Sequence, residues 1–209
     1  MVSRFRNGEE YREWAKGLDW YQTHNLSCGY RTPGTYNPAA RDRVLGSYNF
    51  EGKSILDIGC NSGYYSFFVS SKGAARVVGV DIDSDRLDQA KTIKANEGFD
   101  NVDFCQVPVT NIRSLGQFDI VLCIAVLTEF ERVAKALYEI KHIFSERAFL
   151  ELAVRDKTDM ASAVRELKDG RKIPIPSWHY LDLFFQDTHK VNDLGNGPRY
   201  RMVDVERVK

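Results

Sequence analysis

Residues 54–67 read SILDIGCNSGYYSF, and this stretch decides the fold class. Its first five residues form an apolar run typical of a buried strand, and the aromatic residues that end the stretch begin a segment suited to a helix. Between the two segments, Gly59 and Gly63 enclose a short polar bend. A strand that passes through a glycine-containing turn into a helix is a common binding place for nucleotide-like ligands.

The segments after this turn alternate between strands and helices. The helix that begins at Tyr64 is expected to end at Gly73, and a second helix over residues 85–97 is expected to end at Gly98. A third helix face is marked by Val133, Leu137, Ile140 and Phe144. Strands are predicted from the apolar runs RVVGVD (76–81), VDFCQV (102–107), FDIVLCIAVL (118–127) and RAFLELAV (147–154). This order predicts an α/β fold with a mainly parallel sheet and helices on both faces.

The two ends of the chain differ from this pattern. Near the C-terminus, HKVNDL (189–194) and RYRMVDVERV (199–208) are separated only by GNGP, which predicts an antiparallel hairpin. The first 50 residues show no strand–helix alternation and are expected to form a helix and an irregular lid or flap. The sequence therefore predicts two parts, a flap over residues 1–50 and a ligand-binding domain over residues 51–209.

Composition limits the class of protein. The chain has 209 residues, of which 43% are hydrophobic, and its 29 basic residues equal its 29 acidic residues in number. It therefore has no overall field that would favour nucleic acid or anionic lipid. No apolar run approaches the roughly 18 residues of a membrane span, so a cytoplasmic protein is expected. The four cysteines show no paired spacing, and no metal site is expected.

The turn itself argues against a dinucleotide. A dinucleotide fingerprint has glycine at its first, third and sixth positions, which here hold Gly59, Asn61 and Tyr64. Asp57, just before the turn, would repel phosphates but would attract an ammonium group. Asp81 ends the next predicted strand, where an acid suits both hydroxyls of a ribose. The predicted ligand has a ribose, an amine and little negative charge, and S-adenosylmethionine fits; an oxidoreductase that uses a nucleotide is the lesser alternative.

SILDIGCNSGYYSF followed by GVDID resembles the signature of class I S-adenosylmethionine-dependent methyltransferases. The family's D-x-G-x-G-x-G pattern appears here as Asp57, Gly59, Asn61 and Gly63. Asn61 replaces the middle glycine, which is acceptable because asparagine adopts left-handed conformations more readily than other non-glycine residues. The resemblance implies a Rossmann-like, mainly parallel seven-stranded sheet that ends in an antiparallel hairpin.

A narrower resemblance comes from WYQTHNLSCGYRTPG (20–34), which is similar to a segment of wobble-uridine tRNA methyltransferases that transfer a carboxymethyl group. It implies that the N-terminal loop folds over the cofactor, with Trp20 and Arg43 near it. Thr128 stands where that family has a tyrosine that binds the extra carboxylate, so ordinary S-adenosylmethionine is expected. The segments CNSGYYSFF, VPVTNI, FDIVLCIAVLTEF and IPS (175–177) are also similar to that family.

The remaining cofactor residues are expected at the ends of the predicted strands. Ile82 is expected to pack on the adenine, and the backbone of Val109 and Thr110 to bind its edge. Cys123 and Ile124 end the fourth strand, where either cofactor contact or core packing would explain them. The residues expected to bind the cofactor are Trp20, Arg43, Asp57, Gly59, Asn61, Gly63, Tyr64, Asp81, Ile82, Val109, Thr110, Cys123 and Ile124.

Two residues are candidates for catalysis. Glu129 could remove a proton from a substrate hydroxyl or orient an amine, or it could be an acid at a helix start. His24, in the flap, could face the substrate. The expected reaction is methyl transfer to an oxygen or nitrogen of a small-molecule or glycan acceptor. A tRNA methyltransferase and a non-catalytic S-adenosylmethionine-binding protein are the alternatives.

Overall fold

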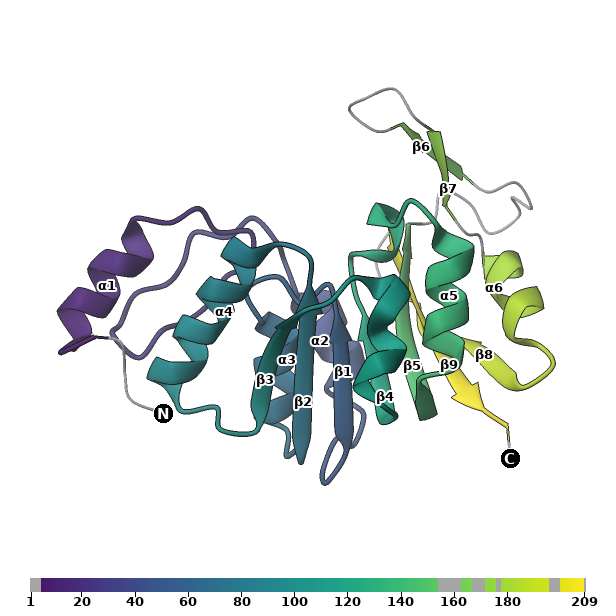
Figure 1. Cartoon of the computed structure of the whole chain (residues 1–209), viewed down its shortest axis with the longest axis horizontal. Helices are drawn as coiled ribbons and strands as arrows, with labels where there is room; N and C mark the ends of the chain where they lie inside the picture. Colours follow the sequence, from purple (N-terminus) through teal and green to yellow (C-terminus); the bar gives the residue numbers. More distant parts are fainter. Residues whose placement is uncertain (1–4, 154–162, 167–171, 176–177, 196–199, 209) are drawn as a thin grey trace. The chain divides into compact units, whose positions relative to one another are not determined.

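The computed structural model describes residues 5–153, 163–166, 172–175, 178–195 and 200–208 (Figure 1). It divides into two compact units, Met1–Val107 and Pro108–Lys209. Seven of the described strands form the main sheet, which is mostly parallel with antiparallel C-terminal strands. The fold class predicted from the sequence is thereby confirmed.

The first unit contains three parallel strands in the order β3-β2-β1. α3 packs on β1 and β2, while α4 packs on β2 and β3. Residues 1–50 belong to this unit and contribute two helices. The elements are α1 (Gly8–Lys16), α2 (Ala39–Leu45), β1 (Ser54–Ile58), α3 (Tyr64–Ser70), β2 (Arg76–Asp81), α4 (Ser84–Glu97) and β3 (Val102–Gln106).

β1 and β2 are buried because their sequences are almost continuously apolar. In β1, only Ser54 is partly exposed, and in β2 the four central residues are buried. Strands covered on both faces have this uniform pattern, whereas a strand with one wet face alternates. The sheet therefore holds the carboxyl ends of β1 and β2 side by side, since the two strands pair in parallel from Ser54 and Arg76 onward.

Two predicted helix ends can be compared with the structure. Gly98 ends α4 in the left-handed conformation, with φ 77°, as predicted. The prediction that α3 extends to Gly73 is wrong, because the helix ends at Ser70 and Gly73 has φ 87°. A residue with positive φ cannot continue a right-handed helix, so Gly73 instead turns the chain toward β2.

The second unit contributes four strands to the main sheet, in the order β4-β5-β9-β8. β4 and β5 are parallel, whereas β9 is antiparallel to both β5 and β8. The antiparallel C-terminal strand pair is confirmed; residues 196–199 of the predicted turn lie outside the described residues. The elements are η1 (Val109–Leu115), β4 (Phe118–Cys123), η2 (Leu127–Glu129), α5 (Val133–Lys141), β5 (Phe144–Ala153), β6 (Ala163–Glu166), β7 (Lys172–Ile175), α6 (Trp178–Phe185), β8 (His189–Asp193) and β9 (Tyr200–Arg207).

The second unit differs from the sequence prediction in several places. Phe144 does not continue the face of α5 but begins β5, where it pairs with Phe118. α6 and the separate antiparallel pair β6 and β7 were not predicted, because their short segments carry no long periodic pattern. Residues 176–177 of the IPS segment lie outside the described residues. In the part of the chain that the structure describes, every helix is too short or too polar to cross a membrane.

The first 50 residues do not form a separate compact unit. They bury several large side chains within the first unit, together with the strands. The buried apolar residues of this segment are Tyr11, Ala15, Trp20, Leu26, Tyr36, Leu45 and Phe50. The division at residue 50 stays a prediction, whereas the compact units divide at Val107.

Candidate functional site

The turn between β1 and α3 is built on three left-handed residues. Gly59, Asn61 and Gly63 have φ angles of 71°, 52° and 91°. The left-handed conformation expected for Asn61 is therefore confirmed. Its side-chain oxygen accepts a hydrogen bond from the backbone N–H of Ser62 at 2.8 Å, which stabilises the bend locally. The turn brings the carboxyl end of β1 directly to the first residue of α3, Tyr64.

Asp81 connects the end of β2 to this turn. Its Oδ2 accepts from the backbone N–H of Asn61 at 2.8 Å. Its Oδ1 accepts from the N–H groups of Ile82 at 2.8 Å and Asp83 at 3.0 Å. A carboxylate has about four acceptor positions, so roughly one remains for an outside donor. Asp81 therefore fixes the turn, and the binding of both ribose hydroxyls by its carboxylate stays a prediction.

The residues that follow Asp81 have distinct environments. Ile82 is 70% exposed, so its side chain is available to cover a flat ring, although contact with adenine stays a prediction. Asp83 caps α4, because its side chain accepts from the N–H groups of Asp85 and Arg86. These bonds satisfy two N–H groups at the start of the helix that have no partner within it.

Asp57 faces the first unit's interior. It is 2% exposed, and its Oδ2 accepts from the hydroxyl of Ser66 in α3 at 2.6 Å. Burial raises the pKa of Asp57 to about 7, the Ser66 hydrogen bond opposes that rise, and the negative charge of Asp81 adds to it. Asp57 is thus a buried residue bonded to α3, and its role in cofactor binding stays a prediction.

A segment of the first 36 residues lies against the glycine turn. The side-chain carbonyl of Gln22, a buried residue, accepts from the hydroxyl of Ser62 at 3.0 Å and from the backbone N–H of Tyr64 at 3.1 Å. His24 Nε2 lies 2.9 Å from the same Ser62 hydroxyl. The hydroxyl of Thr32 accepts from the backbone N–H of His24 and donates to the backbone carbonyl of Gln22. No sequence pattern indicated Gln22 or Ser62, because their partners are about 40 residues away.

The predicted flap residues occupy three kinds of position. His24 is 7% exposed, and burial lowers its pKa to about 4. Trp20 is also buried, and its indole N–H donates to the carbonyl of Ala15 at 2.7 Å. Arg43 is exposed on α2. His24 and Trp20 thus support the segment next to the turn, while a catalytic role for His24 and cofactor contacts of Trp20 and Arg43 stay predictions.

The predicted cofactor residues of the second unit lie at the start of η1 and at the end of β4. Val109 and Thr110 are half-buried, and Thr110 Oγ1 lies 3.3 Å from Asn111 Oδ1. Cys123 is fully buried and Ile124 is 5% exposed, which agrees with the core-packing alternative. Cys60, at the glycine turn of the first unit, is also buried. Burial raises the pKa of its thiol, so Cys60 is not an activated nucleophile.

Glu129 is exposed at the end of η2. Its backbone N–H donates to the carbonyl of Val126 at 2.8 Å. Since α5 begins only at Val133, Glu129 is not in the first turn of that helix. Just before η2, Ala125 has φ 58°, an unusual value for a residue with a side-chain carbon. A catalytic role for Glu129 stays a prediction.

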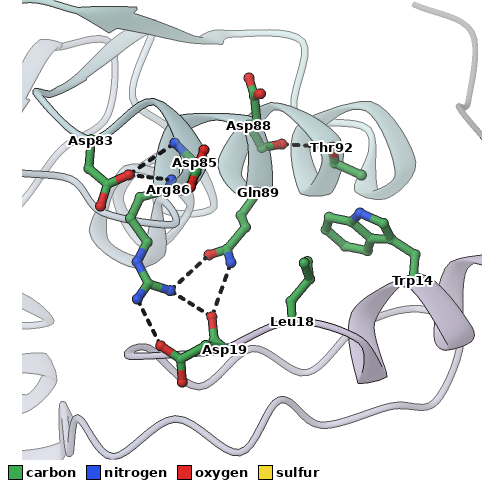
Figure 2. Close-up of a pocket in the computed structure, with 9 residues that line it drawn as sticks. All are labelled: Trp14, Leu18, Asp19, Asp83, Asp85, Arg86, Asp88, Gln89 and Thr92. Carbon is green, nitrogen blue, oxygen red and sulfur yellow. Dashed lines mark hydrogen bonds and ion pairs between the residues drawn. The ribbon is translucent and has the colours of Figure 1, made fainter.

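A cavity of about 370 Å³ lies in the first unit, between the segment after α1 and the first turns of α4 (Figure 2). Arg86 closes one side by donating to the backbone carbonyl of Asp19 at 2.6 Å and to its carboxylate at 3.0 Å. Gln89 donates to the same carbonyl at 3.0 Å. None of the residues predicted to bind the cofactor lines this cavity. These contacts therefore serve to fasten the N-terminal segment to α4.

Comparison with known proteins identifies the family. The family described as "Methyltransferase domain" matches residues 49–172. A tRNA U34 carboxymethyltransferase of Photobacterium profundum is 35% identical over 88 residues, which are 41% of this chain and 27% of that protein. A ubiquinone biosynthesis O-methyltransferase of Psychrobacter arcticus is 29% identical over 114 residues, 53% of this chain and 40% of that protein. The chain thus spans well under half the length of these curated relatives.

Solved structures support the same fold. The N-terminal domain of EvdMO1, crystallised in the presence of SAH and D-fucose, superposes with a TM-score of 0.77 at 19% identity over the whole of both chains. Magnesium protoporphyrin IX methyltransferase from Synechocystis PCC 6803 with bound SAM has a TM-score of 0.62 at 18% identity, covering 81% of this chain and 77% of that one. The resemblance to class I S-adenosylmethionine-dependent methyltransferases is confirmed, and the chain belongs to the methyltransferase domain family.

Proposed function

We propose that this protein transfers a methyl group from S-adenosylmethionine to an oxygen or nitrogen of a small-molecule or glycan acceptor. One observation carries the proposal: the carboxylate of Asp81 ends β2 and is bonded to Asn61, in the middle of the left-handed turn that ends β1. The Asp81 carboxylate can accept a hydrogen bond from a ribose hydroxyl. The backbone N–H of Asn61 already binds this carboxylate, so it is not available to a phosphate.

The residues of the first unit fit a cationic nucleoside. Asp81 retains about one acceptor position, and Ile82 presents an exposed apolar surface beside it. The backbone N–H of Tyr64, at the start of α3, is already bonded to Gln22 and is therefore not available to a phosphate. When bound, S-adenosylmethionine would supply an activated methyl group. The task left to the chain is to bind and orient the two reactants, which alone can account for roughly 7–11 kcal/mol of the barrier.

A small or glycan acceptor is supported by two features. The equal numbers of acidic and basic residues provide no overall attraction for a polyanion. One structure that covers all of this chain is a domain crystallised in the presence of SAH and D-fucose, which supports a sugar as the first acceptor to test. At 19% identity this similarity supports the choice of acceptor class only as a proposal.

A tRNA methyltransferase is the second candidate. It is favoured by the WYQTHNLSCGYRTPG segment and by the carboxymethyltransferase of Photobacterium profundum among the relatives. The structure gives part of this segment a supporting role, because Gln22 and His24 bond to the glycine turn. A non-catalytic protein that only binds S-adenosylmethionine is the third candidate, and the following experiment separates all three.

The test is transfer of a radiolabelled methyl group from S-adenosylmethionine into a fractionated cell extract. Label in the small-molecule or glycan fraction, lost in an Asp81→Asn variant, would support the proposal. Label in the tRNA fraction would favour the second candidate. Binding of S-adenosylmethionine by calorimetry without label in any fraction would favour the non-catalytic protein, whereas failure to bind it would contradict all three.

We also propose that Glu129 assists the transfer by accepting a proton from the acceptor. Its side chain lies on the exposed end of η2, where it can meet a molecule from solvent. Glu129→Gln should lower kcat for a hydroxyl acceptor and leave the affinity for S-adenosylmethionine unchanged. The exposed Glu131→Gln, two residues away, is the matched control and should leave kcat unchanged.

A further inference from the structure

The carboxylate of Asp42 has one oxygen with a partner and one without. Its Oδ2 accepts from the phenol of Tyr64 at 2.7 Å. Its Oδ1 is buried, and in the described part of the chain no group donates to it. A buried carboxylate oxygen without a donor is costly, and the cost disappears when a donor binds. Asp42 is therefore a candidate contact for a ligand rather than for another part of the first unit.

The position of Asp42 relates it to the glycine turn. Its partner Tyr64 directly follows Gly63 and is the first residue of α3. Asp81 contacts the other part of the same turn, through the backbone N–H of Asn61. A nucleoside that places its ribose at Asp81 and extends across the turn toward α3 would bring its far end to Asp42. In S-adenosylmethionine, that far end is the amino acid, which carries an ammonium group.

Asp57 is less suited to receive this ammonium group. Its Oδ2 is bonded to the hydroxyl of Ser66 at 2.6 Å, and the residue is 2% exposed. Asp42, by contrast, has a buried oxygen, Oδ1, to which no group in the described part of the chain donates. The sequence pattern pointed to Asp57, because it lies next to the glycines in the chain, whereas Asp42 is connected to the turn only through Tyr64.

The charge around Asp42 favours a cation over a neutral donor. Burial raises the pKa of Asp42, although the Tyr64 hydrogen bond and the charge of Arg41 oppose the rise. Arg41 itself lies 4.8 Å from the ring centre of Tyr36 and donates to the backbone carbonyl of Asn37 at 3.0 Å. A hydroxyl would satisfy the oxygen but would add no positive charge to that of Arg41. An ammonium group would do both.

We propose that Asp42, held in place by Tyr64, recognises the ammonium group of S-adenosylmethionine. The inference rests on the proposed use of this cofactor but not on the identity of the methyl acceptor. It assigns a binding role to the segment before β1, which lies upstream of the residues matched by the methyltransferase family.

The test compares two ligands by calorimetry. One is S-adenosylhomocysteine, and the other is its analogue in which hydrogen replaces the amino group. Asp42→Asn keeps a side-chain oxygen but removes the negative charge, so the ammonium group would meet an uncharged amide. It should weaken binding of S-adenosylhomocysteine by about 10-fold or more, as expected for a charge-assisted hydrogen bond, and leave binding of the analogue within about 2-fold.

Two further variants sharpen the test. Asp100→Asn removes the same charge from an exposed position of the first unit and should change neither affinity. Tyr64→Phe removes the donor that holds Asp42 and should weaken S-adenosylhomocysteine more than the analogue. If Asp42→Asn does not fold, as judged by its circular dichroism spectrum, the comparison of the two ligands on Tyr64→Phe decides the matter.

The outcomes are distinct. Equal losses for both ligands, or no loss for S-adenosylhomocysteine, would overturn the role of Asp42. A wild-type protein that binds neither ligand would overturn both this role and the proposed function. Selective weakening of S-adenosylhomocysteine, in a protein for which no methyl acceptor is found, would support the role of Asp42 while contradicting the proposed reaction.

Discussion

His24 Nε2 lies 2.9 Å from the hydroxyl of Ser62, and this contact joins the N-terminal segment to the middle of the glycine turn. Ser62 donates its own hydrogen to Gln22, so it accepts one from His24. His24 therefore carries a proton on Nε2, and burial, which lowers its pKa to about 4, keeps the ring neutral. A ring nitrogen used in this way is not free to remove a proton from a substrate, and the geometry favours a supporting role for His24.

The first prediction concerns the stability of this contact in acid. Burial lowers the pKa of His24 to about 4, whereas an unfolded histidine has a pKa near 6.5. The stability contributed by neutral His24 is thus fully present above pH 6.5 and is lost as the pH falls toward 4, up to about 3 kcal/mol. His24→Gln should remove this part of the acid dependence. Urea unfolding at pH 7.5, 5.5 and 4.5 measures it, and parallel pH profiles for the two proteins would contradict the prediction.

The second prediction concerns Asp57. Because burial raises its pKa to about 7, the folded protein binds a proton there that the unfolded chain, with a pKa near 3.8, releases. Ionised Asp57 therefore destabilises the fold increasingly as the pH rises from about 4 to 7. Asp57→Asn should raise the free energy of unfolding at pH 8 by more than it does at pH 5. A difference of the same size at both values would show that the carboxyl is not perturbed.

The third prediction concerns Ala125. Its φ of 58° is unfavourable for a residue with a side-chain carbon but costs glycine little. Ala125→Gly should stabilise the protein by about 0.5–1 kcal/mol in chemical unfolding. Ala134→Gly, at an exposed position of α5, is the control and should destabilise by about 1 kcal/mol. Destabilisation by both changes would argue against the left-handed conformation.

The fourth prediction concerns Asp81. Asp81→Asn removes the charge that binds the Asn61 N–H and that is proposed to receive a ribose hydroxyl. Affinity for S-adenosylhomocysteine should fall by about 10- to 100-fold, the equivalent of 1.5–3 kcal/mol. Calorimetry measures the affinity, with Asp88→Asn on the exposed face of α4 as the control. Unchanged affinity in the Asp81 variant would remove the basis of the ribose assignment.

The elements that could be predicted are those in which local pattern and burial agree. β1 and β2 are short, continuously apolar and bounded by turns, so both were predicted with correct ends. The left-handed conformation of Asn61 followed from residue type and motif. α6 and the β6–β7 pair lack such a signal and were missed, and Phe144 was assigned to the wrong element because its helical spacing continues beyond the end of α5.

The candidate site was predictable only where its residues are close in sequence. Asp57, Asn61 and Asp81 form a motif with fixed spacing. The contacts of Gln22 with Tyr64, and of Arg86 with Asp19, join residues separated by 42 and 67 positions. Contacts over such distances depend on how the segment before β1 folds, and a hydrophobic period carries no information about them.

The attachment of Gln22 and Asp42 to α3 has a consequence for how such a protein can diversify. Both residues come from upstream of position 49, outside the portion shared with the family, yet both touch Tyr64 at the border of its most characteristic motif. Under the proposed role of Asp42, substitutions in the segment before β1 would change the affinity for S-adenosylmethionine while the residues of the motif stay the same.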